Sequence, residues 1–332
     1  MINTDIRYDE YFKSLVEKTT NLGITTHKHK LRYTKDAKKY NYESLELNLF
    51  KENRPNMLIT AGFHGEEIAG PITILHKLEE IVELGKQHDM GLIILPCINP
   101  SGFDIRQRYN ILVNESNEEK APYNNDFIRY VVKNKIVEIL KDDNKYDTWV
   151  YVCDKNIVGR QPSETTRVDR IIKKLPTHKI RAHLDLHQDC FSEDLFEGHK
   201  EEIYTDERGT YAYSFYKESG KLAADYLSIM REAGQIVPVL PKFLIDTGYK
   251  QVPINGDGPK ELAYVPDKKL KVYSDENGFI SLHDGSISDL MFRLDTPYVA
   301  AVETTIKTPI EQSMQVYMTW IKGFMELITE KK

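Results

Sequence analysis

Short apolar runs alternate with longer amphipathic segments along most of this chain. Apolar runs of four to eight residues are typical of strands that are buried on both faces, and apolar residues at helical spacing are typical of helices. The pattern predicts helices at residues 8–21, 68–82, 127–140 and 309–329. It predicts strands at residues 24–33, 42–50, 57–61, 90–97, 148–153, 180–186 and 297–302.

This alternation predicts an α/β fold: a single domain with a mixed, largely parallel central β-sheet flanked by helices. We expect residues 1–50 to form an N-terminal helix and β-hairpin extension packed on the core, and residues 51–332 to form the main domain. The segment 191–279 is rich in Asp, Glu, Lys, Tyr and Gly, which predicts long loops and small strands. Ligand sites in such sheets lie at the carboxyl ends of the strands.

The composition is that of an ordinary globular protein, with 40% hydrophobic and 29% charged residues among 332. A net charge of −6 without a basic block argues against nucleic acid as a partner. Neither a signal peptide nor an apolar run long enough to span a membrane is recognisable. Three widely spaced cysteines, Cys97, Cys153 and Cys190, fit a reducing environment. We therefore expect a cytoplasmic protein without a membrane or protein partner.

The first candidate functional residues follow the apolar strand at residues 57–61. It is followed by Gly62-Phe63-His64-Gly65-Glu66-Glu67, after which a helix is predicted to begin. A tight turn between a strand and a helix directs the imidazole of His64 and the carboxylate of Glu67 toward one point. Nitrogen and oxygen ligands of this kind are typical of catalytic zinc sites.

A third ligand is expected at the end of another strand. In His183-Leu184-Asp185-Leu186-His187 the polar residues alternate with apolar ones and therefore share one face. His187 is nearest the carboxyl end and is the better ligand, while His183 is expected to be a packed, structural histidine. Asp185 is placed to orient the imidazole of His187, since metal-bound imidazoles usually donate their second N–H to a carboxylate or carbonyl.

A general base is expected at the end of the strand at residues 297–302, where Glu303 follows an apolar run. A carboxylate next to a buried strand loses its solvation, and this costs free energy that is tolerated only where the group is paired or functional. The alternative is a structural glutamate that caps the next turn or pairs with Lys307.

Four motifs occur in the order seen in the zinc carboxypeptidase family, which the chain therefore resembles over residues 55–320. They are His64–Glu67, Asn99–Phe103, Asp185–His187 and Val302–Glu303. The succinylglutamate desuccinylase and aspartoacylase group shares much of this pattern. The resemblance implies that residues 51–332 form a zinc peptidase-like catalytic domain with one zinc ion per chain.

Carried over to this sequence, the resemblance implies zinc on His64, Glu67 and His187. Glu303 would activate the zinc-bound water as general base. Arg108, within an Arg-x-Asn sequence, would polarise the scissile carbonyl together with the metal.

The substrate-binding residues depart from the family pattern. Asn124 and Asn125 stand where the family usually carries Asn-Arg, so the arginine that grips a substrate carboxylate is missing there. Arg106 is one of several arginines that could replace it, together with Arg160, Arg167 and Arg293. Ile287 is expected to face the side-chain pocket, and Tyr273 or Tyr298 to contact the substrate.

Three functions compete. The first is a zinc-dependent metallocarboxypeptidase or peptidoglycan-peptide carboxypeptidase/amidase that hydrolyses an amide bond. The second is an N-acyl amino acid deacylase of the succinylglutamate desuccinylase/aspartoacylase type, which the missing arginine favours. The third is a non-catalytic peptide-binding protein, which the intact set of two histidines and two glutamates disfavours. A small peptide or an N-acyl amino acid is the expected substrate.

Overall fold

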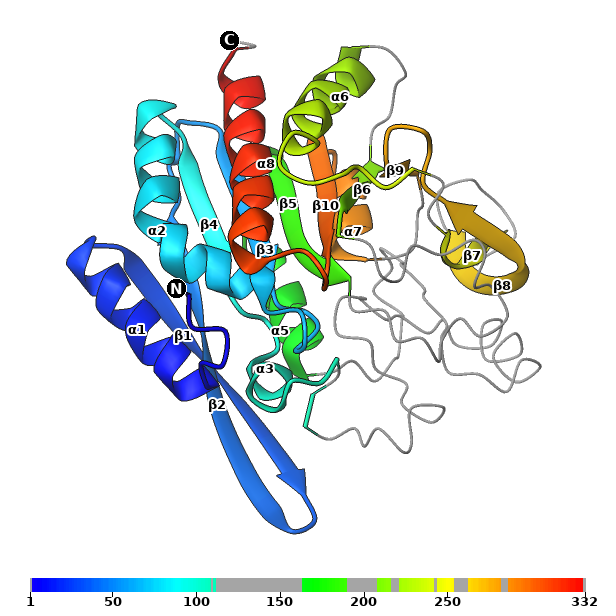
Figure 1. The fold of residues 1–332 in the computed structure, drawn as a ribbon. Coiled ribbons are helices and arrows are strands. Elements are labelled where there is room, and N and C mark those ends of the chain that lie inside the picture. The colour runs from blue at the N-terminus through cyan, green and yellow to red at the C-terminus, as the bar shows by residue number, and fades with distance from the viewer. Residues whose placement is uncertain are drawn as a thin grey trace.

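An eight-stranded β-sheet forms the centre of the fold in the computed structural model (Figure 1). The structure describes residues 2–108, 110–111, 163–189, 208–215, 221–241, 244–253, 262–281 and 286–330. In spatial order the strands are β1 (Thr25–Lys35), β2 (Lys38–Leu49), β4 (Gly91–Leu95), β3 (Asn56–Ala61), β5 (Ile180–Asp189), β10 (Tyr298–Thr305), β6 (Thr210–Phe215) and β9 (Phe279–Ile280).

The four middle strands, β4, β3, β5 and β10, are mutually parallel. Antiparallel neighbours flank them: β2 of the β1–β2 hairpin pairs with β4, and β6 pairs with β10. The sheet is therefore mixed with a parallel centre, which confirms the predicted fold class. Because the middle strands run in one direction, their carboxyl ends meet at one edge of the sheet.

Helices cover both faces of the sheet. One face packs against α1 (Tyr8–Asn21), α2 (Ala69–Gln87), α6 (Lys221–Ala233) and α8 (Ile310–Glu330). The other packs against α5 (Ser163–Ile172) and α7 (Ile287–Arg293). Side chains of a strand alternate between these layers, so Met57 and Ile59 belong to the first core and Leu58 to the second. Within the described ranges, none of the helices is long and apolar enough to cross a membrane.

Most predicted elements agree with the structure. The predicted helix at 8–21 has the bounds of α1, and the predicted strands at 57–61 and 180–186 fall within β3 and β5. The predicted helix at 127–140 and strand at 148–153 lie outside the described residues.

The segment 191–279 contains the short strand β6, in agreement with the expectation of small strands, but it differs from that expectation in two other elements. Its described part holds α6 and a hairpin of two long strands, β7 (Leu244–Pro253) and β8 (Leu262–Tyr273). The helical signal was present, because Tyr226, Ile229 and Met230 recur at helical spacing and are buried against the first core. The polar residues around them obscured that signal.

Candidate metal centre and active site

The first two predicted ligands are held by a turn between β3 and α2 that depends on two glycines. Gly62 has a φ of +67°, which places the chain in the left-handed region just before His64. A Cβ atom on Gly65 would lie 2.0 Å from the carbonyl carbon of Gly102, so no larger residue fits. The turn therefore packs backbone against backbone on the Asn99–Phe103 motif, and His64 and Glu67 are both buried.

The three predicted ligands converge. Glu67 Oε1 lies 2.5 Å from Nδ1 of His64, and its Oε2 lies 2.8 Å from Nδ1 of His187. One ligand atom from each residue lies within 4.8 Å of the other two, and all three side chains are buried. Two imidazole nitrogens and a carboxylate oxygen form a donor set that zinc accepts in catalytic sites. The residues present therefore fit the metal that the sequence predicted.

Asp185 and Thr60 fix the orientation of the His187 ring. Nε2 of His187 lies 2.9 Å from Oδ2 of Asp185, whose other oxygen accepts a hydrogen bond of 2.6 Å from the Thr60 hydroxyl. This arrangement leaves Nδ1 of His187 facing Glu67 and available as a ligand. Such a carboxylate partner is the usual support of a metal-binding imidazole.

Electrostatic interactions within the cluster favour the charged forms of Glu67 and His187. Burial alone would raise the pKa of Glu67, but the imidazoles of His64 and His187 hold it well below its ordinary value. Burial would likewise lower the pKa of His187, yet the carboxylates of Asp185 and Glu67 raise it well above its ordinary value. A bound cation would therefore displace the proton that His187 holds between these carboxylates.

His183 differs from His187 although both lie on the same face of β5. Its Nε2 lies 3.0 Å from the Thr60 hydroxyl and its Nδ1 lies 3.4 Å from the Ser288 hydroxyl. Burial lowers the pKa of His183 to about 4, so the ring is neutral near neutral pH. This agrees with the predicted structural role.

Glu303 stands beside His187 in the parallel register of β10 and β5. Its side chain is buried, and within the described ranges its Oε2 has no hydrogen-bond partner. Burial raises the pKa of Glu303 well above its ordinary value, and the carboxylates of Glu67 and Asp189 raise it further. An unpartnered buried oxygen next to the ligand cluster fits a proton acceptor better than a structural cap.

Asp189 and Tyr211 join this edge of the sheet and were not predicted. The Tyr211 hydroxyl donates a hydrogen bond to Asp189, and Tyr211 is opposite Glu303 in the antiparallel register of β6 and β10. Burial raises the pKa of Asp189 to about 8. Asp189 continues the period-two pattern of His183, Asp185 and His187, which is the signal that could have identified it.

Arg108 reaches the cluster from the segment after α3 (Pro100–Ile105). Its Nη1 lies 3.4 Å from Oε1 of Glu67 and 3.7 Å from Oε1 of Glu66, and its side chain is 39% exposed. The side-chain amide of Asn99 and the backbone N–H of Gly65 both donate hydrogen bonds to the carbonyl of Arg108. The guanidinium is thus held beside the candidate metal centre while part of it remains accessible.

A buried polar network supports the segment that carries Arg108. The Asn110 side chain donates a hydrogen bond of 3.1 Å to Oε2 of Glu164 on α5, and the Tyr33 hydroxyl donates to its other oxygen. Glu164 is fully buried. Sequence reasoning missed it because it lies far from Arg108 along the chain, within a helix that the pattern did not reveal.

The structure gives the predicted substrate residues little support. Asn124 and Asn125 lie outside the described residues. The Arg106 guanidinium donates hydrogen bonds to the carbonyls of Thr4, Ile6 and Phe103, which anchors the N-terminal segment.

Two further expectations concern apolar and aromatic residues. Ile287 is fully buried and belongs to the second core, in the same apolar cluster as Phe63 and Val299. Tyr298, one of the two tyrosines expected to contact the substrate, begins β10 and lies at the edge of the sheet opposite His187.

Comparison with known proteins identified one matching family and several solved structures with a similar fold. Residues 53–197 match the family described as succinylglutamate desuccinylase/aspartoacylase catalytic domain. That segment contains His64, Glu67, Arg108 and His187. The comparison with curated proteins found no match.

Several solved structures share the fold. A candidate metallopeptidase from Shewanella baltica OS155 is 20% identical, with a TM-score of 0.59 over 96% of this chain and 91% of that chain. Bovine thrombin-activatable fibrinolysis inhibitor, solved in complex with tick carboxypeptidase inhibitor, is 12% identical, with a TM-score of 0.55 over 98% of both chains. A metallo-carboxypeptidase from Burkholderia cenocepacia is 12% identical, with a TM-score of 0.50 over 97% of this chain and 69% of that chain.

At these identities the solved structures establish the fold, while the family match adds the segment that carries the candidate ligands. Together they confirm the resemblance of this chain to the zinc carboxypeptidase-like group that includes the succinylglutamate desuccinylase/aspartoacylase catalytic domain.

Proposed function

We propose that the chain is a zinc-dependent hydrolase that cleaves an amide bond in a small peptide or a related acylated amino acid. The family match supports a hydrolase. The observation that carries the proposal is the convergence of His64, Glu67 and His187 within 4.8 Å, with the buried carboxyl of Glu303 on the neighbouring strand.

In this proposal three residues bind the metal and a fourth orients one of them. His64 and His187 would bind zinc through Nδ1 and Glu67 through its carboxylate, with Asp185 keeping the second nitrogen of His187 protonated. Zinc, when bound, supplies Lewis-acid chemistry that polarises a carbonyl and acidifies water.

Glu303 takes the proton of the attacking water on its carboxylate and passes it to the leaving amine, so that no proton is lost or gained overall. Burial strengthens this group as a proton acceptor, because it raises the pKa of Glu303. Arg108 donates hydrogen bonds to the oxygen on which negative charge develops. Its exposed fraction and its position beside Glu67 support this role.

A metallocarboxypeptidase is the first candidate within this class, in keeping with the order of the four motifs and the fold. The second is an N-acyl amino acid deacylase, which the family match over residues 53–197 favours. Both reactions hydrolyse an amide next to an amino acid and use the same groups. They differ in whether the acyl side is a peptide or a small acid.

A substrate panel tests the proposal. Zinc-loaded protein is incubated with peptides that have a free carboxyl terminus, with peptidoglycan stem peptides and with N-acyl amino acids, and released amine is measured. We expect cleavage in at least one class, loss of that activity with a chelator and recovery with added zinc. Cleavage of N-acyl amino acids alone would select the second candidate. Absence of hydrolysis in all three classes, with zinc shown to be bound, would contradict the proposed function.

A further inference from the structure

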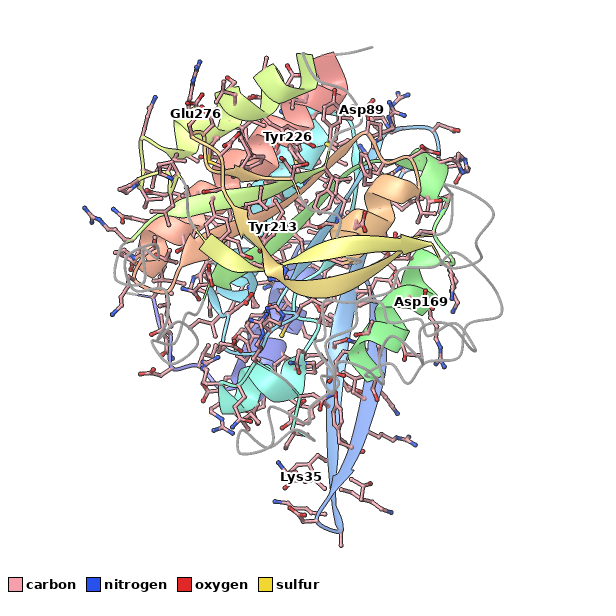
Figure 2. The ribbon with its side chains drawn as sticks, turned by 90° about the vertical axis from the view of Figure 1, so that its right-hand side faces the viewer. Lys35, Asp89, Asp169, Tyr213, Tyr226 and Glu276 are labelled. Carbon is pink, nitrogen blue, oxygen red and sulfur yellow. The ribbon has the colours of Figure 1, made fainter. Side chains whose placement is uncertain are left out.

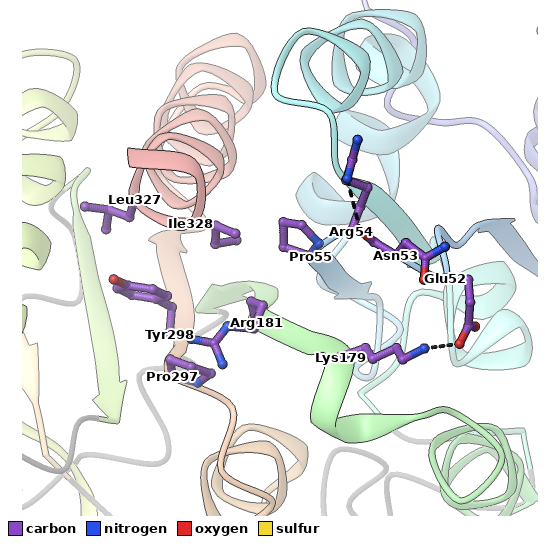
Figure 3. Close-up of a pocket in the computed structure, with 10 residues that line it drawn as sticks. All are labelled: Glu52, Asn53, Arg54, Pro55, Lys179, Arg181, Pro297, Tyr298, Leu327 and Ile328. Carbon is purple, nitrogen blue, oxygen red and sulfur yellow. Dashed lines mark hydrogen bonds and ion pairs between the residues drawn. The ribbon is translucent and has the colours of Figure 1, made fainter. Parts of the chain in front are cut away.

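A pocket of about 370 Å³ lies at the edge of the sheet opposite the candidate metal centre (Figure 3). Its walls come from the turn before β3, the amino ends of β5 and β10, and the last turns of α8. Its volume is within the range of small-molecule sites. It is lined by Glu52, Asn53, Arg54, Pro55, Lys179, Arg181, Pro297, Tyr298, Leu327 and Ile328.

The charged residues of the pocket are of two kinds. Lys179 is paired with Glu52, and Arg54 is paired with Asp89, so these two cations already have partners. Arg181 has no ion pair or hydrogen bond to any residue in the described ranges. Figure 3 shows its guanidinium beside Pro297 and Tyr298, whereas Lys179 extends away toward Glu52. Within the part of the chain that the structure describes, Arg181 is therefore the one cation of this pocket without a partner, and it faces the pocket.

The remaining wall is apolar. Pro55, Pro297 and Tyr298 line the pocket from the strand side, and Leu327 and Ile328 from α8. Tyr298 and Ile328 are largely buried, and their positions are fixed because both belong to the first core. A rigid apolar wall beside a planar guanidinium complements a ligand that has both an apolar body and a carboxylate, which a guanidinium can bind through two parallel hydrogen bonds.

We propose that this pocket binds a small organic monoanion, a carboxylate attached to a compact apolar group, with the carboxylate on Arg181 and the apolar group against Tyr298, Leu327 and Ile328. A single charge is favoured over a phosphate dianion because the two other cations of the pocket are already paired. The site is separate from the proposed active site: Arg181 and His187 lie at opposite ends of β5, about 20 Å apart at the rise of a strand.

Phenylacetate is a suitable probe. Phenylacetamide has the same shape without the charge, acetate has the charge without the apolar group, and phenyl phosphate has a second charge. The protein as purified is titrated with each compound while the methyl resonances of Leu327 and Ile328 are followed by NMR. We expect saturable shifts with phenylacetate and at least tenfold weaker binding of the other three compounds.

Substitutions assign the binding to Arg181. Arg181→Gln is expected to weaken phenylacetate binding at least tenfold, in keeping with loss of a charge-assisted hydrogen bond, and Arg181→Lys to weaken it less. The matched control is Arg32→Gln, an exposed arginine of β1, which should leave the binding unchanged. An absence of shifts, equal binding of phenylacetamide, tighter binding of phenyl phosphate, or unchanged binding in Arg181→Gln would each overturn the proposal. Hydrolytic activity is not the readout, so this result is independent of the proposed function.

Discussion

The charged side chains at the carboxyl ends of the parallel strands are buried, whereas the charged side chain of Arg181 at the amino end of β5 is exposed. At the carboxyl ends, Glu303 is buried beside His187, which belongs to a buried cluster of two imidazoles and a carboxylate. At the amino ends, Arg181 is exposed and its pocket is open to solvent. Figure 2 shows Lys35 at the far end of the β1–β2 hairpin. The three candidate ligands at the carboxyl edge, in contrast, are all buried.

This difference follows from solvation. Charges removed from water interact far more strongly with one another than charges at the surface do. The buried cluster can therefore hold a cation and shift proton affinities, which bond cleavage requires. The exposed edge can bind an anion reversibly, but it cannot strongly shift the proton affinity of that anion. The predictions below test whether the two edges differ in this way.

The largest effect is expected from Glu303→Gln, which removes the proton acceptor and retains the shape of the side chain. We expect kcat to fall about a thousandfold, as for a lost general base, while zinc stays bound. Steady-state kinetics and metal analysis measure both quantities. Glu311→Gln, an exposed residue of α8, is the matched control and should retain full activity. Near-normal turnover in Glu303→Gln would remove this residue from the mechanism.

Arg108→Gln comes next. Loss of a donor to a developing oxyanion lowers kcat about a hundredfold or more, with a smaller change in KM. The control, Arg231→Gln, changes an exposed arginine of α6. If KM rises and kcat is unchanged, Arg108 binds the substrate without stabilising the transition state, and the carboxyl edge contributes less electrostatic stabilisation than we propose.

Local periodicity predicted the elements on which these residues stand. Strands such as β3 are short, apolar and followed by a turn, so their ends and the chemistry of His64 and Glu67 could be inferred from neighbouring residues. Asp185 could be inferred in the same way from the alternation along β5.

Other features depend on contacts between distant parts of the chain. Glu164 reaches Asn110 only through the packing of α5, and the pocket at Arg181 assembles four segments that the sequence does not relate. The place of Tyr298 at the amino end of β10 could not be inferred, because a tyrosine near a strand carries no signal about the end at which it lies.

His183→Gln tests how strongly burial acts at the carboxyl edge. Because burial lowers the pKa of His183 to about 4, the unfolded chain takes up a proton between pH 6.5 and 4 that the folded chain does not. This histidine therefore reduces the stability of the native protein as the pH falls through that window, by about 3 kcal/mol in total.

The measurement is the unfolding free energy with chelator present, from urea titrations at pH 7 and pH 4. The stability of the native protein relative to His183→Gln should decrease by that amount at the lower pH. His178→Gln, an exposed histidine, is the control. A difference that does not vary with pH would show that His183 is not held neutral by burial.

Glu164→Ala is expected to have the smallest effect. The Tyr33 hydroxyl and the Asn110 amide would lose their acceptor in a buried site, at a cost of about 2 kcal/mol in unfolding free energy. Because Asn110 helps to hold the segment of Arg108, kcat should fall about tenfold with zinc retained. Glu232→Ala on α6 serves as the exposed control. Lower stability with unchanged kcat would limit Glu164 to a structural role.

The central claim is that His64, Glu67 and His187 hold a metal ion, and zinc content tests it most directly. Native protein, His187→Ala and His183→Gln are loaded with zinc, dialysed and analysed for metal and protein. We expect one zinc per chain in the native protein and in His183→Gln, and a large loss in His187→Ala, because His187 contacts Glu67, whereas His183 contacts the hydroxyls of Thr60 and Ser288. Equal zinc content in His187→Ala and the native protein, or no zinc in the native protein, would contradict the account.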